Sequence, residues 1–519
     1  MRILFSVRNP AYVRYYDSVL RALAARGHTV ELVTQPGRRS WPPSVVALAD
    51  ACPQIRLSSL PDVAFNPWWE LASRLRQARF YLRFLRPEYA HAPELLARAR
   101  TRAPWTAVRL GESVGRRTGA RGVLVRIIDV LEQSTRGAAL FREYLRAQRP
   151  DLVVTTPLVV LKTAQLDLAR AATELGVRNI FAVASWDHLS SKGELNFAPQ
   201  QVLVWNEIQK QEAVDLHQIA ADRVVVTGAP VFDDWFGRRP STTREEFCAR
   251  VGLRPDRPLV LYVCSGLLEG SPPEPPFVQR WVQHLRASGH PALRECGILV
   301  RPHFRRGREW RGVDFSGFDN VACWPPLGDV PDDTSSKNDY FDSLYHAFAT
   351  VGLNTSAMIE AAVLGRPVHT ILVPEFQHSQ EGTLHFRYLL DGPDRLLRAS
   401  SSLDDHARVL AVVLEGRDTD PHRSARFVRA FVRPCGVNAP ATDRFVDALE
   451  RVAAQPSPQP VAVPAWAPII RPLLWPVAQA AARRARRMKT ASSQDKERRL
   501  AEHRRRKRSD AVARAEQVP

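Results

Sequence analysis

The stretch DYFDSLYHAFATVGLNTSAMIEAAVLGRPVHTI, residues 339–371, carries the clearest structural pattern in this sequence. An apolar strand ends near Gly352, a helix begins among the small and polar residues Asn354, Thr355 and Ser356, and the segment 365–367 leads into another strand. Strand, helix and strand in this order form the unit of a parallel sheet with a right-handed crossover. The stretch therefore predicts an α/β fold.

The same alternation recurs along most of the chain, in two series. They are separated near residues 237–256, where Gly237, Pro240 and Pro255 surround a short helix. We expect two Rossmann-like, doubly wound domains, 1–236 and 237–455, with a cleft between them. The expected strands are 3–7, 30–33, 152–155, 179–183, 201–205 and 223–227 in the first domain, and 259–264, 297–300, 321–324, 349–352 and 367–372 in the second.

Length and cysteine content narrow the class of protein. A chain of 519 residues is too long for one ordinary core. The six cysteines are scattered, without a CxxC pair or a Cys/His cluster, which argues against a disulfide framework and a zinc site. The first residues lack the apolar core of a signal peptide, and no run approaches the roughly 18 apolar residues of a spanning helix. We therefore expect a cytoplasmic protein.

Two segments depart from the α/β pattern, and the first is a helical insertion at about 65–150 in the first domain. It places four arginines on one face of an amphipathic helix. We expect this face to be solvated while the helix covers the sheet. The alternative is that the arginines lie on a membrane or bind an acidic acceptor. The four residues are Arg76, Arg79, Arg83 and Arg86.

The second is the basic tail, 456–519, which holds 15 Lys and Arg against 5 Asp and Glu and so about half of the net charge of +19. Its prolines predict that the first part forms no regular helix. The apolar and aromatic residues before the arginine cluster predict peripheral contact with an anionic membrane through 466–489, at the inner face of the plasma membrane. The alternative is a disordered, solubilising tail.

Residues typical of phosphate binding follow three strands of the second domain. The backbone N–H groups of Asn354, Thr355 and Ser356, together with the Thr and Ser hydroxyls, suit a diphosphate. Helix capping alone also favours these three residue types. Glu360, one turn further along, suits ribose hydroxyls. An arginine and a histidine that follow the expected strand 297–300 suit phosphate contacts. The backbone amides of the small turn after the expected strand 259–264 could also contact a phosphate. These further candidates are Ser265, Gly266, Arg301 and His303.

The candidate acceptor side begins with FAVASWDHLSSKGELNF, residues 181–197. Asp187 or His188 could deprotonate an acceptor hydroxyl, and Lys192 could hold an anionic acceptor; a structural loop capped by Asp187 is the alternative. The segment 374–390 concentrates donors and acceptors that suit sugar hydroxyls, and the first loop faces the expected cleft. The candidate acceptor- or sugar-binding residues are Arg8, Asn9, Lys192, Gln380, Glu381, Thr383 and His385.

The segment NTSAMIEAAVLGRPV resembles the donor-nucleotide segment of GT-B glycosyltransferases, and also those of UDP-N-acetylglucosamine 2-epimerases and CDP-glycerol glycerophosphotransferases. The Ser-Trp-Asp segment at 185–187 is similar to segments of bacterial surface-polysaccharide transferase-like proteins. The resemblance implies a GT-B enzyme that moves a sugar from a nucleotide-diphosphate donor to a glycan or lipid-linked acceptor in surface polysaccharide, or capsule, biosynthesis.

The resemblance also implies that neither a metal nor another cofactor is needed. Gly352 stands where many retaining members carry an acidic residue, which implies an inverting reaction. A CDP-glycerol-type polyol-phosphate transferase and a UDP-N-acetylglucosamine 2-epimerase remain as alternatives. A non-catalytic nucleic-acid binder is disfavoured because no RNA- or DNA-binding module is visible in the sequence.

Overall fold

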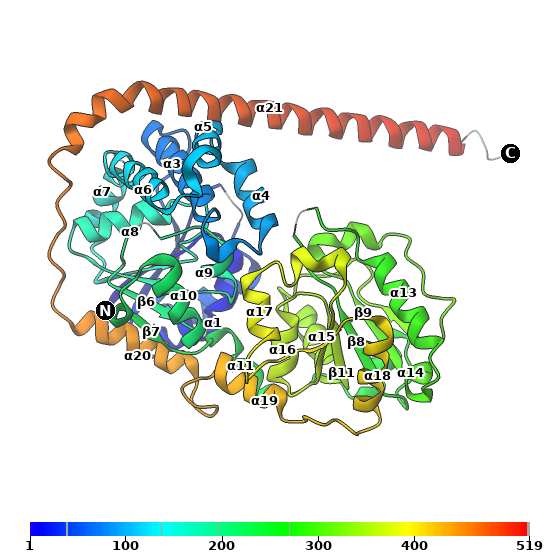
Figure 1. The fold of residues 1–519 in the computed structure, drawn as a ribbon. Coiled ribbons are helices and arrows are strands. Elements are labelled where there is room, and N and C mark those ends of the chain that lie inside the picture. Colours follow the sequence, from blue (N-terminus) through cyan, green and yellow to red (C-terminus); the bar gives the residue numbers. More distant parts are fainter. Residues whose placement is uncertain (38–39, 136, 196, 269, 516–519) are drawn as a thin grey trace.

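The computed structural model describes residues 1–37, 40–135, 137–195, 197–268 and 270–515. It contains two fully parallel sheets, with strand orders β3-β2-β1-β4-β5-β6-β7 and β10-β9-β8-β11-β12-β13 (Figure 1). The predicted pair of Rossmann-like α/β domains is therefore confirmed. The strands are β1 (Arg2–Val7), β2 (Thr29–Thr34), β3 (Ile55–Ser59), β4 (Leu152–Thr156), β5 (Arg178–Ala182), β6 (Gln201–Val204), β7 (Val224–Val226), β8 (Leu259–Val263), β9 (Gly297–Arg301), β10 (Val321–Cys323), β11 (Ala349–Gly352), β12 (Val368–Ile371) and β13 (Arg398–Ser400).

Helices cover both faces of each sheet, which explains why the central strands are apolar throughout. In β1, Phe5 packs into one core cluster and Leu4 into another on the opposite face. In β8, Leu261 and Tyr262 likewise pack into two different core clusters on opposite faces of the sheet.

The helices of the first sheet and its insertion are α1 (Asp17–Ala25), α2 (Pro43–Ala51), α3 (Pro67–Arg83), α4 (Pro93–Arg102), α5 (Trp105–Leu110), α6 (Thr118–Gln133), α7 (Ala139–Gln148), α8 (Gln165–Glu174), α9 (His188–Ser191), α10 (Glu207–His217) and α11 (Asp233–Gly237). Those that follow are α12 (Arg244–Val251), α13 (Pro275–Arg286), α14 (Pro291–Glu295), α15 (Thr334–Tyr345), α16 (Ala357–Val363), α17 (Leu384–Leu390), α18 (Leu403–Leu414), α19 (Arg423–Phe427), α20 (Ala441–Ala454) and α21 (Ala467–Ala515).

The arginine face of α3 points into the protein. Arg76 is buried, and its guanidinium contacts Glu132 at 2.6 Å and Asp167 at 2.7 Å. Arg79 is also buried and contacts Glu194 at 3.0 Å. The prediction of a solvated face is wrong, because acidic residues from α6, α8 and the loop after α9 neutralise these charges inside the structure. The same burial excludes the alternative that this face lies on a membrane.

The last helix of the expected second domain returns to the first. In α20, Phe445 and Leu449 join the core cluster that contains β1 and α1. The crossing is fixed by Arg433, which contacts Asp233 at 2.8 Å, and by Asn206, whose amide donates to the carbonyl of Phe431 at 2.8 Å. The division into 1–236 and 237–455 stays a prediction, but α20 packs as part of the first domain.

The tail forms a long helix, α21, that lies across α3 (Figure 1). Residues 456–466 form no helix, as their prolines predicted, but the prediction is wrong from Ala467 on, where α21 includes two prolines. Pro472 and Pro476 both lie on the exposed side, where carbonyls that lose a helical partner can reach water. Burial of Ala478 and Ala482 against the first domain offsets the remaining cost. Among the described residues, no helix is both long and apolar enough to cross a membrane.

Candidate functional site

The expected donor segments meet where the strand order of the second sheet reverses. β8 and β11 are neighbours there; β8 is followed by α13 and β11 by α16, and these two helices pack into different core clusters. Open α/β sheets bind ligands outside the carboxyl ends of the strands at such a switch point. The backbone N–H of Asn354, after β11, donates to the hydroxyl of Ser265, after β8, at 3.0 Å. This bond joins the two segments into one surface at the sheet edge.

The exposed Gly266 and the half-buried His303 form the next part of this surface. A Cβ atom on Gly266 would come within 2.9 Å of Cε1 of His303, so the ring packs directly on the glycine backbone. Burial, together with the charges of Arg305 and Arg14, lowers the pKa of His303 to about 4. The imidazole is therefore neutral at physiological pH. Its Nδ1 accepts from the N–H of Arg305 at 3.3 Å, which leaves Nε2–H as the donor.

Arg301 is less available to a diphosphate than the sequence suggested. It is buried, contacts Asp339 at 2.9 Å and lies over the Tyr340 ring at 5.1 Å. The Tyr340 hydroxyl donates to Glu360, the residue predicted to bind ribose. Burial raises the pKa of Glu360, while the Tyr340 hydroxyl and the Arg14 charge oppose that rise. Arg14 of the first domain thus acts on Glu360 across the domain boundary.

Several predicted residues bind other parts of the protein. The N–H of Ser265 donates to Glu274 at 2.9 Å, and the amide of Asn354 donates to the carbonyl of Ser379, so neither group is free for phosphate as expected. Thr355 is half-buried and Ser356 is exposed. Together with the exposed Gly266, they keep main-chain groups at the sheet edge accessible.

The loop after β12 is also largely structural. The buried side chain of Gln380 donates to the carbonyls of Leu353 and Ile371, and the buried Thr383 donates to the carbonyl of Gln380 at 2.9 Å. These bonds hold the loop against β11 and β12. Glu381 is only half-buried, so a ligand can reach it, whereas the adjacent Gln380 is buried.

On the first domain, Asp187 begins α9 as an ionised group. Its carboxylate contacts Nζ of Lys192 at 2.8 Å and accepts from the hydroxyl of Ser185 at 2.8 Å. Burial alone would raise its pKa, but Lys192, His188 and His385 lower it well below the usual value. Its side chain keeps 22% of its exposure, so the carboxylate remains reachable. Asp187 therefore combines charge, access and a fixed orientation.

His188 and His385 flank this carboxylate from the two domains. Burial lowers the pKa of each to about 4, and neither Nδ1 has a hydrogen-bond partner within the described residues. His385 lies edge-on to Trp186 at 4.7 Å, which brings α17 of the second domain against the Asp187 loop. Beside this contact, the Tyr388 hydroxyl donates to Glu212 at 2.9 Å. The candidate base therefore lies at the contact between the domains.

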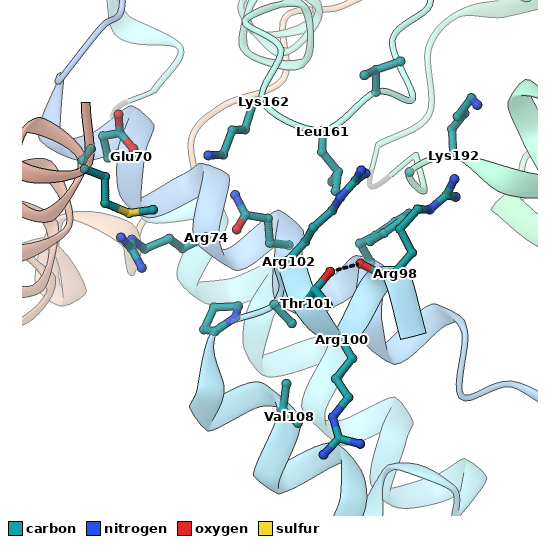
Figure 2. Close-up of a pocket in the computed structure, with 18 of the residues that line it drawn as sticks. Glu70, Arg74, Arg98, Arg100, Thr101, Arg102, Val108, Leu161, Lys162 and Lys192 are labelled. Carbon is teal, nitrogen blue, oxygen red and sulfur yellow. Dashed lines mark hydrogen bonds between the residues drawn. The ribbon is translucent and has the colours of Figure 1, made fainter. Parts of the chain in front are cut away.

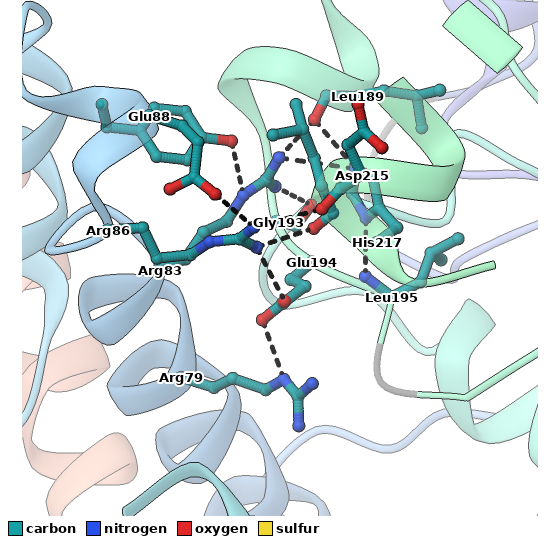
Figure 3. Close-up of polar contacts among 12 residues, drawn as sticks. Arg79, Arg83, Arg86, Glu88, Leu189, Gly193, Glu194, Leu195, Asp215 and His217 are labelled. Atoms are coloured by element: carbon teal, nitrogen blue, oxygen red, sulfur yellow. Dashed lines mark hydrogen bonds and ion pairs between the residues drawn. The ribbon is translucent and has the colours of Figure 1, made fainter. Parts of the chain in front are cut away.

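The helical insertion holds the Asp187 loop in place (Figure 3). The buried guanidinium of Arg83 donates to the carbonyls of Lys192 and Gly193, each at 2.8 Å, and to that of Leu189. His217 bonds the same loop through the Leu189 carbonyl at 2.8 Å. The α3 arginines are thus positioning residues for the candidate site, a role that helical periodicity alone could not reveal.

The first loop contributes one residue that the sequence reasoning missed. Asn9 caps the short helix 10–15 by accepting from the N–H of Ala11 at 3.1 Å, which gives it a structural role. Tyr12 lies between the domains: burial raises its pKa to about 12, and the charges of Asp187 and Arg305 both act on it. Its place in the connection that follows the first strand was the available signal.

No family model and no curated protein matches this sequence. Among solved structures, a protein of Listeria monocytogenes assigned as a UDP-N-acetylglucosamine 2-epimerase aligns over 89% of this chain and 99% of its own, with 10% identity and a TM-score of 0.51. The UDP-N-acetylglucosamine 2-epimerase of Neisseria meningitidis, bound to UDP-N-acetylglucosamine, aligns over 87% and 100%, with 11% identity and a TM-score of 0.49. A glycosyltransferase of Rickettsia africae aligns over 88% and 99%, with 11% identity and a TM-score of 0.48. At this identity the likeness concerns the fold, and this chain has the two-domain GT-B fold.

Proposed function

We propose that the protein is a glycosyltransferase that moves a sugar from a nucleotide-diphosphate donor to a glycan or lipid-linked acceptor. One observation carries this proposal: the accessible main chain at Gly266 and Ser356 lies at the switch point of the second sheet, while Asp187 lies at the contact with the first domain. A transferase needs a diphosphate site and a base on opposite sides of the transferred carbon, and we assign the first role to the main chain at Gly266 and Ser356 and the second to Asp187.

In this proposal the donor diphosphate lies against the carboxyl ends of β8 and β11. Main-chain amides at Gly266 and Ser356 and the Nε2–H of His303 donate to its oxygens, which stabilises charge as the diphosphate leaves. Because Arg301 is already paired with Asp339, the positive charge comes instead from Arg14 of the first domain, which acts on both His303 and Glu360.

Asp187 is the proposed general base. It accepts the proton of the acceptor hydroxyl while that oxygen attacks the anomeric carbon, and the bond from this carbon to the diphosphate breaks. A single displacement of this kind inverts the anomeric carbon. Asp187 is preferred over His188 because the histidine is 3% exposed, whereas the carboxylate can be reached from solvent.

We further propose that α21 places the enzyme on an anionic membrane, where surface polysaccharides are assembled. Ile469, Leu473 and Val477 recur every four residues and are exposed, so they form one outward apolar face. Arg484 and Arg487 follow them and are also exposed. An apolar face followed by arginines is typical of helices that lie in the interface of anionic lipid.

The test is thermal unfolding with UDP, CDP, GDP and dTDP, each added alone. A diphosphate that binds at about a hundred times its Kd should stabilise the native state by about 2.7 kcal/mol. A shift with CDP alone would favour the polyol-phosphate transferase, and conversion of UDP-N-acetylglucosamine without any acceptor would favour the epimerase. If no nucleotide shifts the transition, the proposed function is wrong.

Asp187→Asn provides the second arm. This variant should bind the nucleotide as the wild type does, while transfer falls by about 10²–10⁴-fold, the usual contribution of a general base. His188→Asn is the matched control and should retain most of the activity. Equal losses in the two variants would contradict the assignment of Asp187.

A further inference from the structure

A large basic cavity lies outside the donor surface, between the helical insertion and α21. Its volume is about 1690 Å³, above the roughly 300–1,000 Å³ of an ordinary small-ligand pocket. Eleven of the described side chains that line it are Lys or Arg, and two are Glu. Figure 2 shows cationic side chains from separate elements around this space, among them Arg74, Arg98, Arg102 and Lys162. We call it the basic chamber.

Arg74 and Arg98 each lie near a second cation that lines the basic chamber. Burial lowers the pKa of Arg74, and the nearby Arg484 lowers it further; burial and the nearby Arg102 do the same for Arg98. The Nε–H groups of Arg74 and Arg98 are buried and, in the part of the chain that the structure describes, have no acceptor. Buried donors of this kind are costly unless a ligand satisfies them.

The inner end of the basic chamber reaches the proposed transfer site. Lys192 lines it and contacts Asp187 at 2.8 Å. Tyr12 and Arg305 also line it, and Arg305 is two residues from His303. A ligand bound in the chamber can therefore present one end to the candidate base and to the donor.

The outer end combines cationic and apolar groups. Trp105 and Met488 line it and are 64% and 60% exposed, and Nζ of Lys489 lies 5.1 Å from the centre of the Phe65 ring. α21 forms this wall, and the same helix carries the outward apolar face proposed to lie on the membrane. A phosphate group next to an apolar chain would match both kinds of lining.

We propose that the basic chamber binds the diphosphate group of a phosphorylated acceptor, with Arg74, Arg98 and Arg102 on the phosphates and the accepting hydroxyl at Asp187. This inference rests on the proposed glycosyltransferase function and names its acceptor class. A nucleic acid fits less well, because α21 walls one side of the chamber and a strand needs an open groove along its length. The diphosphate can belong to a lipid-linked or to a soluble acceptor.

The experiment measures binding of farnesyl diphosphate, inorganic diphosphate and farnesol to the full chain by calorimetry. Two variants remove charge from opposite walls, Arg98→Gln with Arg102→Gln, and Arg74→Gln with Arg484→Gln. Arg98 also donates to the carbonyl of Ser191, so its replacement can disturb the Asp187 loop as well as ligand binding. The second variant leaves Arg98 in place, so a loss of binding in both variants cannot come from that loop alone. The matched control removes two exposed arginines outside the chamber, Arg146→Gln with Arg294→Gln.

We expect both chamber variants to weaken binding of the diphosphates by about tenfold or more, since a hydrogen bond to a charged group contributes roughly that factor. The control variant should bind as the wild type does. Farnesyl diphosphate binding more tightly than inorganic diphosphate and farnesol identifies a lipid-linked source, whereas equal binding of the two diphosphates identifies a soluble one. UDP should not compete with farnesyl diphosphate for the chamber.

The proposal is overturned if the chamber variants and the control bind the diphosphates equally. It is also overturned if a short oligothymidylate binds the wild type more tightly than either diphosphate and loses affinity in the chamber variants. UDP binding separates the two proposals. Diphosphate binding that depends on the chamber, in a protein that fails to bind any nucleotide, would refute the transferase function while leaving the chamber as a phosphate site.

Discussion

Replacing Arg83 with Met tests whether the helical insertion positions the candidate base. Arg83 is 2% exposed, and its guanidinium donates to three carbonyls of the Asp187 loop. It also donates to the Tyr89 hydroxyl at 2.8 Å. Methionine fills much of the same volume but satisfies none of these acceptors. A buried polar group that loses its partner costs about 1–3 kcal/mol, and part of the loop can relax toward water. We therefore expect the free energy of unfolding to fall by about 3–5 kcal/mol.

The assay combines urea unfolding with limited proteolysis by trypsin after Lys192. In Arg83→Met the unfolding midpoint should fall and cleavage at Lys192 should accelerate, because the loop that carries it loses its anchor. Arg146→Met is the matched control. Arg146 is an exposed residue of α7, and its replacement should change stability by no more than about 1 kcal/mol. Equal midpoints and equal cleavage rates in the two variants would refute the positioning role.

Three further predictions concern stability, the donor surface and the membrane. Burial raises the pKa of Glu274 to about 8, so the folded protein keeps a proton that the unfolded chain releases above about 4.5. Stability should fall as pH rises from about 4.5 to 8, and Glu274→Gln should flatten this slope in urea titrations; an unchanged slope would contradict the assignment. Gly266→Ala should weaken UDP binding by about tenfold by displacing the His303 ring, and wild-type affinity would argue against a diphosphate there. Ile469→Glu with Leu473→Glu should abolish sedimentation with anionic liposomes without changing the unfolding temperature, because both side chains are exposed; retained sedimentation would exclude this face as the membrane contact.

The sequence predicted the central strands well and the sheet edges less well. Strands near the centre are buried on both faces and read as apolar runs, whereas β3 and β13, which were not predicted, are edge strands with polar residues in their short sequences. The helix that contains Pro472 and Pro476 was not predicted, because the exposure of a proline decides its cost in a helix. For the edge strands and for the proline-containing helix alike, the sequence does not show which other element packs against the segment.

The same limit applied to the site. Periodicity placed Arg76 and Arg79 on one helical face, but their partners come from distant segments, so the sequence could not show that this face is buried. Strand ends correctly brought Ser265 and Asn354 together, since parallel strands share an edge. Residue type alone could not separate Gln380, which bonds the protein's own carbonyls, from groups that a ligand can reach.

A crystal structure of the protein with UDP would locate the diphosphate and so show whether the β8–β11 edge is the donor site. We expect diphosphate oxygens within about 3 Å of the main-chain nitrogens at Gly266 and Ser356 and of Nε2 of His303. A nucleotide bound elsewhere, or a vacant β8–β11 edge at saturating UDP, would contradict this expectation.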